Sequence, residues 1–427
     1  MIIAHGKIYP SEEQERILAE AEERICATLA EKNLPAQTVI SAIDKLGREI
    51  ERGAFDELIS SLPIDDPAHY KDMAAEMLSR EFLENKLKIE LGLSGTDCAA
   101  PKNAVRSRVM PLGVLFHIAA GNMDGLPAFS LAEGLLAGNV NILKLPQADN
   151  GLSVEIIARL IEYEPQLADF IYVFDTPSSD IHAMRKMAEL ADGIAVWGGD
   201  EATAAVRALA PIGVKLIEWG HKLSFAYISG YSDKERELSA LAAHIASTKQ
   251  MLCSSCQDIY LDTENENDLE EFCAEFLPLL EREVGRKAPT SIGGRAHSTL
   301  LKYTDMLENI IGEKPLPKMF KGMGCSLSVK TDSELELSDM MCNVLVKPLP
   351  RRRILSVLRR KKTCLQTVGL ICADTERAEL ADLFARCGAV RITTAGNMSE
   401  YFAGEAHDGE YPLRRYTRIV NEEQNNL

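Results

Sequence analysis

The sequence has no long apolar run, few aromatic residues and no excess of positive charge. No apolar segment reaches the ~20 residues that a membrane-spanning helix requires, so we expect no membrane span. The net charge of −17 argues against extensive binding to nucleic acid or anionic membranes, although it leaves room for a local basic patch. The one strongly basic run, at 351–362, is interpreted as a solvated helix face, with a contact to ligand phosphates as the alternative.

The N-terminus has no cationic start followed by an apolar run, so we expect no signal peptide. The ten cysteines are scattered without the spacing of a small disulfide-linked domain, which favours a reducing cytoplasm. No internal repeat and no low-complexity tract is visible. At 427 residues the chain is too long for one hydrophobic core. We therefore expect a soluble cytoplasmic protein of two or three domains.

Apolar residues recur at helical spacing over 11–60 and 70–92, which predicts amphipathic helices. From about 105 the rhythm changes to short apolar strands that alternate with helices. The predicted strands are 113–118, 140–144, 170–174, 193–197, 215–217 with 225–228, and 258–261. The predicted helices between them are 127–137, 152–163, 179–191, 200–209 and 234–249. This alternation predicts a parallel, doubly wound α/β sheet with helices on both faces.

A second alternation of helices and strands follows, over 266–387. The polar break at 229–233 is the expected domain boundary. The tail from about 397 is rich in glycine, charge and tyrosine, which indicates an appendage outside the core. The predicted division is therefore 1–228, 229–396 and a C-terminal tail at 397–427.

Cys253 lies between a predicted helix and the strand at 258–261. A cysteine on such a connection is partly exposed and near backbone N–H groups, which favour the thiolate. Together with Cys256 it also forms a Cys-x-x-Cys pair, which is compatible with a redox disulfide or half of a zinc site. Two ordinary buried cysteines remain the alternative. No second Cys-x-x-Cys occurs, so the metal interpretation is weak.

The loop 119–125 follows an apolar strand and contains small residues, Ala120 among them, that permit close approach of a ligand. Asn122 in this loop is a candidate donor to an oxyanion, or else a turn or N-cap asparagine. Gly198 and Gly199 separate a strand from a helix, which is compatible with an anion site or with an ordinary helix start.

Two ionisable residues stand at strand ends. Lys144 ends the strand at 140–144, where it either contacts a cofactor or lies on the surface. Glu218 lies between apolar strands, where burial would raise the pKa of its carboxyl group and make it a general base.

The order of these features resembles the aldehyde dehydrogenase superfamily over about 105–262. The Pro-Leu-Gly-Val run at 111–114 leads to the loop asparagine, an Ala-Gly-Asn turn and a strand that ends in Leu-Lys. The runs 197–201 and 217–222 resemble the family's Gly-Ser-Thr-Glu turn and its Leu-Glu-Leu-Gly-Gly-Lys segment. Gln250 and Cys253 resemble its nucleophile motif. The resemblance implies a doubly wound parallel cofactor-binding sheet, a second α/β catalytic domain and Cys253 as the nucleophile.

Within the superfamily the chain is similar to the acyl-CoA reductase branch typified by LuxC. The Cys-Ser-Ser triplet that begins at Cys253 and the tail segment 406–420 carry this similarity. The branch implies reduction of an acyl thioester to an aldehyde, with an acyl-CoA or an acyl-protein as donor and an acyl-protein synthetase as a partner. It also implies a homo-oligomer, for which the tail beyond 397 is the expected interface.

The resemblance assigns roles to the candidates. Cys253 attacks the acyl carbonyl, Asn122 and the Cys253 backbone N–H hold the oxyanion, and Glu218 assists proton transfer. Ala120, Lys144, Gly198 and Gly199 contact the cofactor. Gln147 stands where NAD-preferring relatives often carry a glutamate, so NADPH is expected to be tolerated and NADH remains possible.

Three departures from the family pattern keep alternatives open. Two residues separate Gln250 from Cys253, and Thr203 replaces a glycine of the turn motif. The later Glu-Ile-Phe-Gly-Pro motif is absent, and Glu336 is only a loose substitute for its glutamate. The altered glycine turn and the missing motif suggest a catalytically silent member, and the match at Glu218 keeps an aldehyde-oxidising dehydrogenase open. Cys256 and His244 are interpreted as a bystander and a structural histidine.

Overall fold

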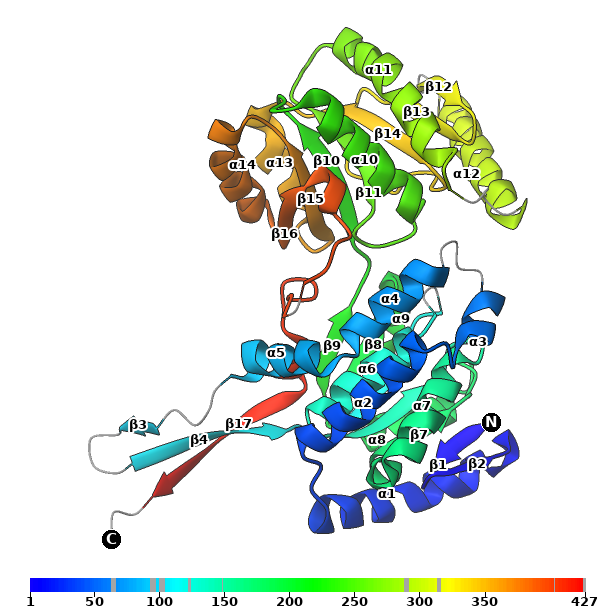
Figure 1. Cartoon of the computed structure of the whole chain (residues 1–427), viewed down its shortest axis with the longest axis vertical. Coiled ribbons are helices and arrows are strands. Elements are labelled where there is room, and N and C mark those ends of the chain that lie inside the picture. The colour runs from blue at the N-terminus through cyan, green and yellow to red at the C-terminus, as the bar shows by residue number, and fades with distance from the viewer. Residues whose placement is uncertain are drawn as a thin grey trace. The chain divides into compact units, whose positions relative to one another are not determined.

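The apolar strands of the first half of the chain pair into one sheet in a computed structural model of the protein (Figure 1). The structure describes residues 1–62, 67–92, 97–99, 104–121, 124–147, 149–287, 292–312, 316–402 and 404–424. The sheet has the strand order β2-β1-β7-β6-β5-β8-β9. Its strands are β1 (Ile2–Ala4), β2 (Lys7–Tyr9), β5 (Val114–Ile118), β6 (Val140–Lys144), β7 (Ile171–Phe174), β8 (Gly193–Trp197) and β9 (Lys215–Trp219).

Strands β5 to β9 run parallel, as the alternation of strands and helices predicts. The β1–β2 hairpin, which the sequence analysis missed, adds an antiparallel edge through β1 and β7. Every residue of β5, β6, β7 and β8 is buried. Continuous burial is the signature of a parallel sheet that is covered by helices on both faces.

Helices cover this sheet in two groups. The first-half helices are α1 (Gln14–Glu31), α2 (Ala36–Glu51), α3 (Asp56–Ser61), α4 (Pro67–Met77), α5 (Arg80–Leu91), α6 (Leu126–Leu136), α7 (Leu152–Tyr163), α8 (Ile181–Glu189) and α9 (Asp200–Leu209). Helix α2 packs on α6 and α7, whereas α8 packs on α1 and α9. Because β5, β6 and β7 progress in one direction across the sheet and β8 and β9 in the other, right-handed crossovers place α6–α7 and α8–α9 on opposite faces.

The reversal of strand order between β5 and β8 is a topological switch point. In open α/β sheets, ligands bind at such a point, beyond the carboxyl ends of the strands. The loops after β5 and β8 contain Ala120 and the Gly198–Gly199 pair, so the fold brings these two predicted elements to the same edge.

A second seven-stranded sheet has the order β12-β13-β14-β11-β10-β15-β16 and is parallel except for the pair β12–β13. Its strands are β10 (Leu223–Ile228), β11 (Cys256–Leu261), β12 (Lys318–Gly322), β13 (Cys325–Val329), β14 (Asn343–Pro348), β15 (Leu365–Ile371) and β16 (Arg391–Thr394). The helices around it are α10 (Lys234–Thr248), α11 (Glu266–Val284), α12 (Ile292–Ile311), α13 (Ile354–Leu358) and α14 (Asp374–Cys387).

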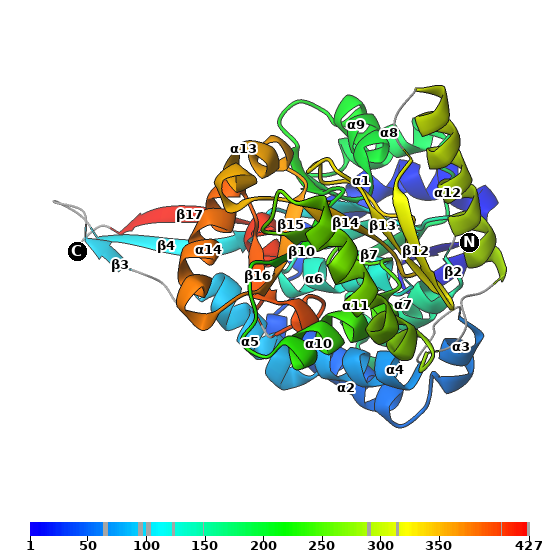
Figure 2. The same cartoon turned by 90° about the horizontal axis from the view of Figure 1, so that it is seen from above.

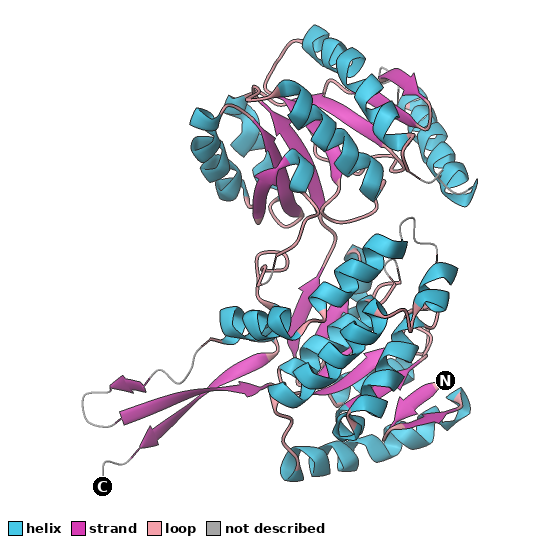
Figure 3. Cartoon of the chain, viewed as in Figure 1, coloured by secondary structure: helices cyan, strands magenta, loops and turns pink. Residues whose placement is uncertain are grey.

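Two separate hydrophobic cores lie against this second sheet. One includes residues of α10 and α11, and the other includes residues of α13 and α14. Figure 3 shows that helices flank the strands of this sheet. The predicted second α/β domain is thus a doubly wound sheet as well. Among the described residues, no helix of either sheet combines the length and the apolar character needed to cross a bilayer.

The chain divides into two compact units, 1–220 with 402–427 and 221–401. The predicted boundary at 228 lies one strand too late, because β10 pairs with β11 and β15 in the second sheet. Sequence alone does not distinguish these partners, since β9 and β10 are both apolar and only a short turn separates them. Burial corrects a second expectation. The tail is not an appendage throughout, because Leu413 and Tyr416 are fully buried in the core of the first unit.

The end of the tail pairs with an earlier strand to form an arm of the first unit. Strand β17 (Thr417–Gln424) is antiparallel to β4 (Ala104–Pro111), and β3 (Asp97–Ala99) completes a three-stranded sheet. Figure 2 shows β4 and β17 side by side, projecting from the first unit as in Figure 1. The tail is held at its base by Glu90, whose carboxylate accepts from the Leu413 backbone N–H at 2.8 Å.

We predict that Leu413→Ala destabilises the protein by about 2–5 kcal/mol, because it leaves a cavity in a closed core. Ile212→Ala is the matched control, since Ile212 is fully exposed and its truncation changes stability by less than about 0.5 kcal/mol. Urea unfolding of both variants measures the difference. Equal stability of the two variants would show that the tail is not part of the core.

Candidate active site

Cys253 lies on a short turn between α10 and β11. Helix α10 ends with two consecutive residues in the left-handed region, Lys249 (φ 47°) and Gln250 (φ 63°). The chain then turns through Leu252 to Ser255, where the Ser255 N–H donates to the Leu252 carbonyl and the Ser255 hydroxyl accepts from the Leu252 N–H, both at 3.0 Å. The sequence analysis expected Cys253 to be exposed on this connection, and its side chain is exposed.

Buried polar side chains fix the backbone of this turn. Ser224, at the start of β10, donates its hydroxyl to the Cys253 carbonyl at 2.7 Å. The side-chain amide of Gln250, which is 1% exposed, donates to the Cys256 carbonyl at 2.9 Å. The Gln257 amide in turn donates to the Gln250 carbonyl at 2.9 Å. The turn therefore presents an accessible thiol on a backbone that three side-chain hydrogen bonds hold in place.

Ser224 and Gln257 were missed by the sequence analysis. Each is a polar residue inside an otherwise apolar strand, and that departure from the pattern is the signal that could have singled them out. Burial of a polar group is costly unless it is hydrogen-bonded, so such residues usually have a structural partner.

The second cysteine of the pair is unsuited to redox chemistry. Cys256 is fully buried, and burial raises the pKa of its thiol well above the ordinary value. Its S–H donates to the Asp258 carbonyl at 3.3 Å. The structure thus favours the bystander interpretation of Cys256. None of the nine cysteines whose side chains the structure describes is in a disulfide bond.

His244 lies beside the same turn and has a structural role. Its Nε2 accepts from the Cys256 backbone N–H at 3.3 Å. Burial, aided by the positive charge of Arg391, lowers the pKa of His244 to about 4. The imidazole is therefore neutral at physiological pH and caps the backbone at the start of β11.

In the first unit, three predicted cofactor contacts lie at one edge of the sheet, namely Lys144 at the end of β6, Ala120 after β5 and Gly198 after β8. Lys144 at the end of β6 is paired in register with Ile118 of β5, and Ile118 is paired with Val196 of β8. Lys144 is only 4% exposed, and burial lowers the pKa of its amine, so it is not an ordinary surface lysine. Gln147 follows it on the exposed side of the loop. Asn122 lies outside the described residues.

Gly198 and Gly199 connect β8 to the first turn of α9. The Gly198 N–H donates to the Trp219 carbonyl at 3.2 Å, which ties the loop to β9. A Cβ atom on Gly199 would meet no atom within 4 Å, so the space beside it is open. The hydroxyl of Thr203, one turn into α9, is buried without a hydrogen-bond partner. An open glycine loop at a helix N-terminus, on the carboxyl edge of a parallel sheet, fits the phosphates of a dinucleotide.

Glu218 differs from its expected role. Its carboxylate is bound by the Arg207 guanidinium of α9 through two contacts, at 2.5 and 2.6 Å. These contacts outweigh partial burial and lower the pKa of Glu218, so the expectation of a raised pKa is wrong. The sequence analysis missed this because an arginine eleven residues earlier is not recognisable as a partner until α9 is placed beside β9.

Glu336 is engaged within the second unit. Its carboxylate forms an ion pair with Lys330 at 3.1 Å and another with the buried Lys347. Lys347 also binds Asp332 at 3.0 Å, and it lies 3.8 Å from Asp258. The loose assignment of Glu336 to a cofactor ribose therefore has a competing explanation, which is neutralisation of a buried lysine.

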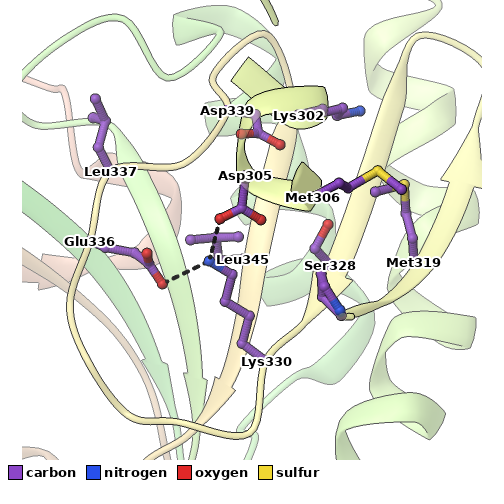
Figure 4. A pocket seen from close by; sticks show the side chains of 11 residues that line it. Lys302, Asp305, Met306, Met319, Ser328, Lys330, Glu336, Leu337, Asp339 and Leu345 are labelled. Carbon is purple, nitrogen blue, oxygen red and sulfur yellow. Dashed lines mark hydrogen bonds and ion pairs between the residues drawn. The ribbon is translucent and has the colours of Figure 1, made fainter. Parts of the chain in front are cut away.

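A small pocket of about 50 Å³ opens beside this cluster, between α12 and strands β12 to β14. Figure 4 shows Lys330 between Asp305 of α12 and Glu336, with ion pairs to both. Asp339 and Lys302 line the same pocket. Cys253 is not among the lining residues, so the pocket does not contain the candidate nucleophile.

Part of the basic run at 351–362 is matched by carboxylates, with ion pairs at Arg351, Arg352 and Lys361. Arg351 pairs with Glu376 at 2.7 Å, and Arg352 pairs with Glu264. This supports the interpretation of a solvated surface stabilised by local ion pairs.

The family model described as acyl-CoA reductase (LuxC) matches residues 33–419. The chain belongs to this family. It is 24% identical to the long-chain acyl-protein thioester reductase of Vibrio harveyi over 358 residues, which cover 82% of this chain and 73% of the relative. It is also 24% identical to the enzyme of that name from Photorhabdus luminescens, over 82% of this chain and 72% of the relative. The branch that the sequence analysis identified is confirmed.

Solved structures confirm the aldehyde-dehydrogenase fold of this acyl-CoA reductase family member. The glyceraldehyde-3-phosphate dehydrogenase GapN of Methanocaldococcus jannaschii, complexed with NADP, is similar with a TM-score of 0.72 at 12% identity and covers 98% of this chain and 96% of its own. The lactaldehyde dehydrogenase of Escherichia coli is similar with a TM-score of 0.68 at 13% identity, over 98% of this chain and 92% of its own.

Asp258 gives a testable pH dependence. Complete burial raises the pKa of its carboxyl group to about 8, although the positive charge of Lys347, 3.8 Å away, opposes the shift. Between about pH 4 and pH 8 the group is neutral in the folded protein and ionised in the unfolded chain. Its contribution to stability is therefore complete below pH 4 and is lost as the pH rises through 8.

We predict that Asp258→Asn removes this dependence. The stability of the wild type relative to the variant should fall by about 1.4 kcal/mol per pH unit between pH 5.5 and 7.5. Urea unfolding of both proteins at several pH values measures this difference. A constant difference across that range would mean that Asp258 is ionised in the folded protein.

Proposed function

We propose that this protein reduces a long-chain acyl thioester to an aldehyde through an acyl-Cys253 intermediate, with NADPH as the preferred reductant and NADH as an alternative. The observation that carries the proposal is the exposed Cys253 thiol on a turn whose carbonyls are bound by Ser224 and Gln250. Membership of the acyl-CoA reductase family supports the reaction class.

The chemistry begins at the thiol. The Cys253 thiolate attacks the acyl carbonyl and displaces the carrier thiolate, which takes up a proton. The backbone N–H of Cys253 and the Asn122 amide are the proposed oxyanion donors. When bound, the nicotinamide cofactor supplies the hydride that converts the acyl-cysteine to a thiohemiacetal. Collapse of the thiohemiacetal releases the aldehyde and regenerates Cys253.

The first unit holds the residues proposed to bind the cofactor. Lys144 and Gln147 receive the adenosine end, Gly198 and Gly199 receive the phosphates, and Ala120 permits close approach at the switch point. The open space beside Gly199 and the shared edge of β5, β6 and β8 support this arrangement.

The acyl donor is proposed from the relatives, which are named for long-chain acyl-protein thioesters. An acyl-CoA or an acylated protein therefore delivers the chain, and an acyl-protein synthetase is the proposed partner. We also propose that the protein forms a homo-oligomer through the arm of β4 and β17. The arm contains the end of the tail, which is the segment expected from the sequence to form the interface.

A second candidate is an aldehyde-oxidising dehydrogenase of the same fold, in which a base activates water against the acyl-enzyme. The Arg207 guanidinium lowers the pKa of Glu218 and makes it a weak base, which favours the reductase.

We predict that Cys253→Ala abolishes acylation and lowers NADPH oxidation by about 10³-fold or more. Mass spectrometry after incubation with palmitoyl-CoA, without reductant, detects the acyl adduct directly. Cys26→Ala is the matched control, because Cys26 is exposed on α1 and should leave both measurements unchanged. An adduct that persists in Cys253→Ala would assign the nucleophile to another residue.

We predict that Gln147→Glu shifts the cofactor preference towards NADH. A carboxylate at this exposed position repels the 2′-phosphate of NADPH, so the KM for NADPH should rise about tenfold while that for NADH changes little. Gln166→Glu, an exposed change elsewhere in the same unit, is the control. Equal changes for both cofactors would place the adenine ribose away from Gln147.

A further inference from the structure

The two tryptophans of the sequence end neighbouring strands of the first sheet. Trp197 is the last residue of β8 and is paired in register with Trp219, the last residue of β9. Their rings are 5.4 Å apart, with an interplanar angle of 33°. Both side chains are almost completely buried, at 9% and 3% exposure. The two buried indoles therefore form an aromatic surface at the carboxyl ends of these two strands.

The tail places His407 against this aromatic surface. The imidazole centroid lies 5.0 Å from each indole, tilted by 55° to Trp197 and by 80° to Trp219. A tight loop makes this possible, because Gly404, Asp408 and Gly409 all adopt positive φ. The Glu410 N–H closes the loop on the His407 carbonyl at 2.9 Å.

The imidazole is partly accessible and lies near a carboxylate. Its Nε2 lies 3.8 Å from a carboxylate oxygen of Asp408, whose side chain is only 6% exposed. The His407 side chain itself is 36% exposed. One side of the ring is therefore packed on tryptophan while part of it remains open to a ligand.

The strand order indicates which ligand reaches this position. Along the carboxyl edge the order is β6, β5, β8, β9. The proposed adenosine contacts lie at β6 and the proposed phosphate contacts follow β8. An extended dinucleotide on these contacts would continue towards β9, about 14 Å from β6 at three strand spacings. Its nicotinamide half would then lie beside His407. Gly220, which follows β9, leaves open space there as Gly199 does.

We propose that His407 is a further cofactor-binding residue, which contacts the nicotinamide half of NAD(P)H. This inference rests on the proposed function. The imidazole N–H is a hydrogen-bond donor to a ribose hydroxyl or the carboxamide oxygen, and the two indoles hold the ring in place. The C-terminal segment thereby completes a cofactor site whose other residues come from the first half of the chain.

Tryptophan emission tests this directly, because both tryptophans lie in the cluster with His407. Reduced nicotinamide absorbs where tryptophan emits, so NADPH bound beside His407 should quench tryptophan emission and give sensitised nicotinamide emission. The measurement needs no acyl substrate and no turnover. 2′,5′-ADP carries the adenosine half alone and should bind with little change in emission.

The variants separate a binding role from a structural one. His407→Ala should raise the Kd for NADPH about 3- to 10-fold, as expected for the loss of one hydrogen bond. It should leave the Kd for 2′,5′-ADP, measured by calorimetry, unchanged. His407→Gln keeps a donor and should recover part of the loss. His182→Ala, an exposed histidine on α8, is the control and should have no effect.

Three results would overturn the inference. NADPH that binds by calorimetry without quenching tryptophan would place the nicotinamide elsewhere and leave the reductase proposal intact. Equal losses of NADPH and 2′,5′-ADP affinity in His407→Ala would make His407 a structural residue, and an unchanged Kd for NADPH would deny it a binding role. Absence of any NADPH and NADH binding to the wild type would instead refute the proposed function itself.

Discussion

The candidate site depends on the backbone directly after α10, which has an unfavourable conformation. Lys249 and Gln250 both have positive φ without being glycine, which costs about 1–3 kcal/mol for each residue. A second left-handed run, at 340–342, meets the first, because the Met341 N–H donates to the Lys249 carbonyl at 2.8 Å. The buried Gln250 amide holds the other side of the turn. These contacts offset the strain, and they turn Cys253 outward while Cys256, on the strand, points into the core.

Much of the fold was predictable because local pattern and tertiary structure agree. Strands β6 and β8 and helices α7 and α9 have the bounds that their apolar periodicity predicts. Buried parallel strands are short continuous apolar runs, which makes them easy to recognise. What the pattern does not encode is the partner of each strand. The assignment of β10 to the wrong sheet has this cause. Strands β1 and β17 were not detected for another reason, because β1 has only three residues and β17 is mostly polar.

The site was predictable as a set of strand-end positions, but the electrostatics were not. Cys253 was expected to be exposed from its place between a helix and a strand, and it is. The environment of Glu218 depends on Arg207, and that of His407 depends on two tryptophans about two hundred residues away in sequence. Such contacts arise only when the sheet is assembled and the tail returns to it. Long-range pairing therefore decides the protonation and packing of side chains whose positions are locally encoded.

The Glu218–Arg207 pair bears on the direction of the reaction. An acyl-cysteine that awaits hydride must survive contact with water, whereas an oxidising enzyme must hydrolyse the same intermediate. A carboxylate held by two guanidinium contacts has a lowered pKa and is a poor acceptor for a proton from water. The first unit thus keeps the glutamate of the family motif while depriving it of basicity. For the proposed reductase this is an advantage, because a weak base does not promote hydrolysis of an acyl-enzyme.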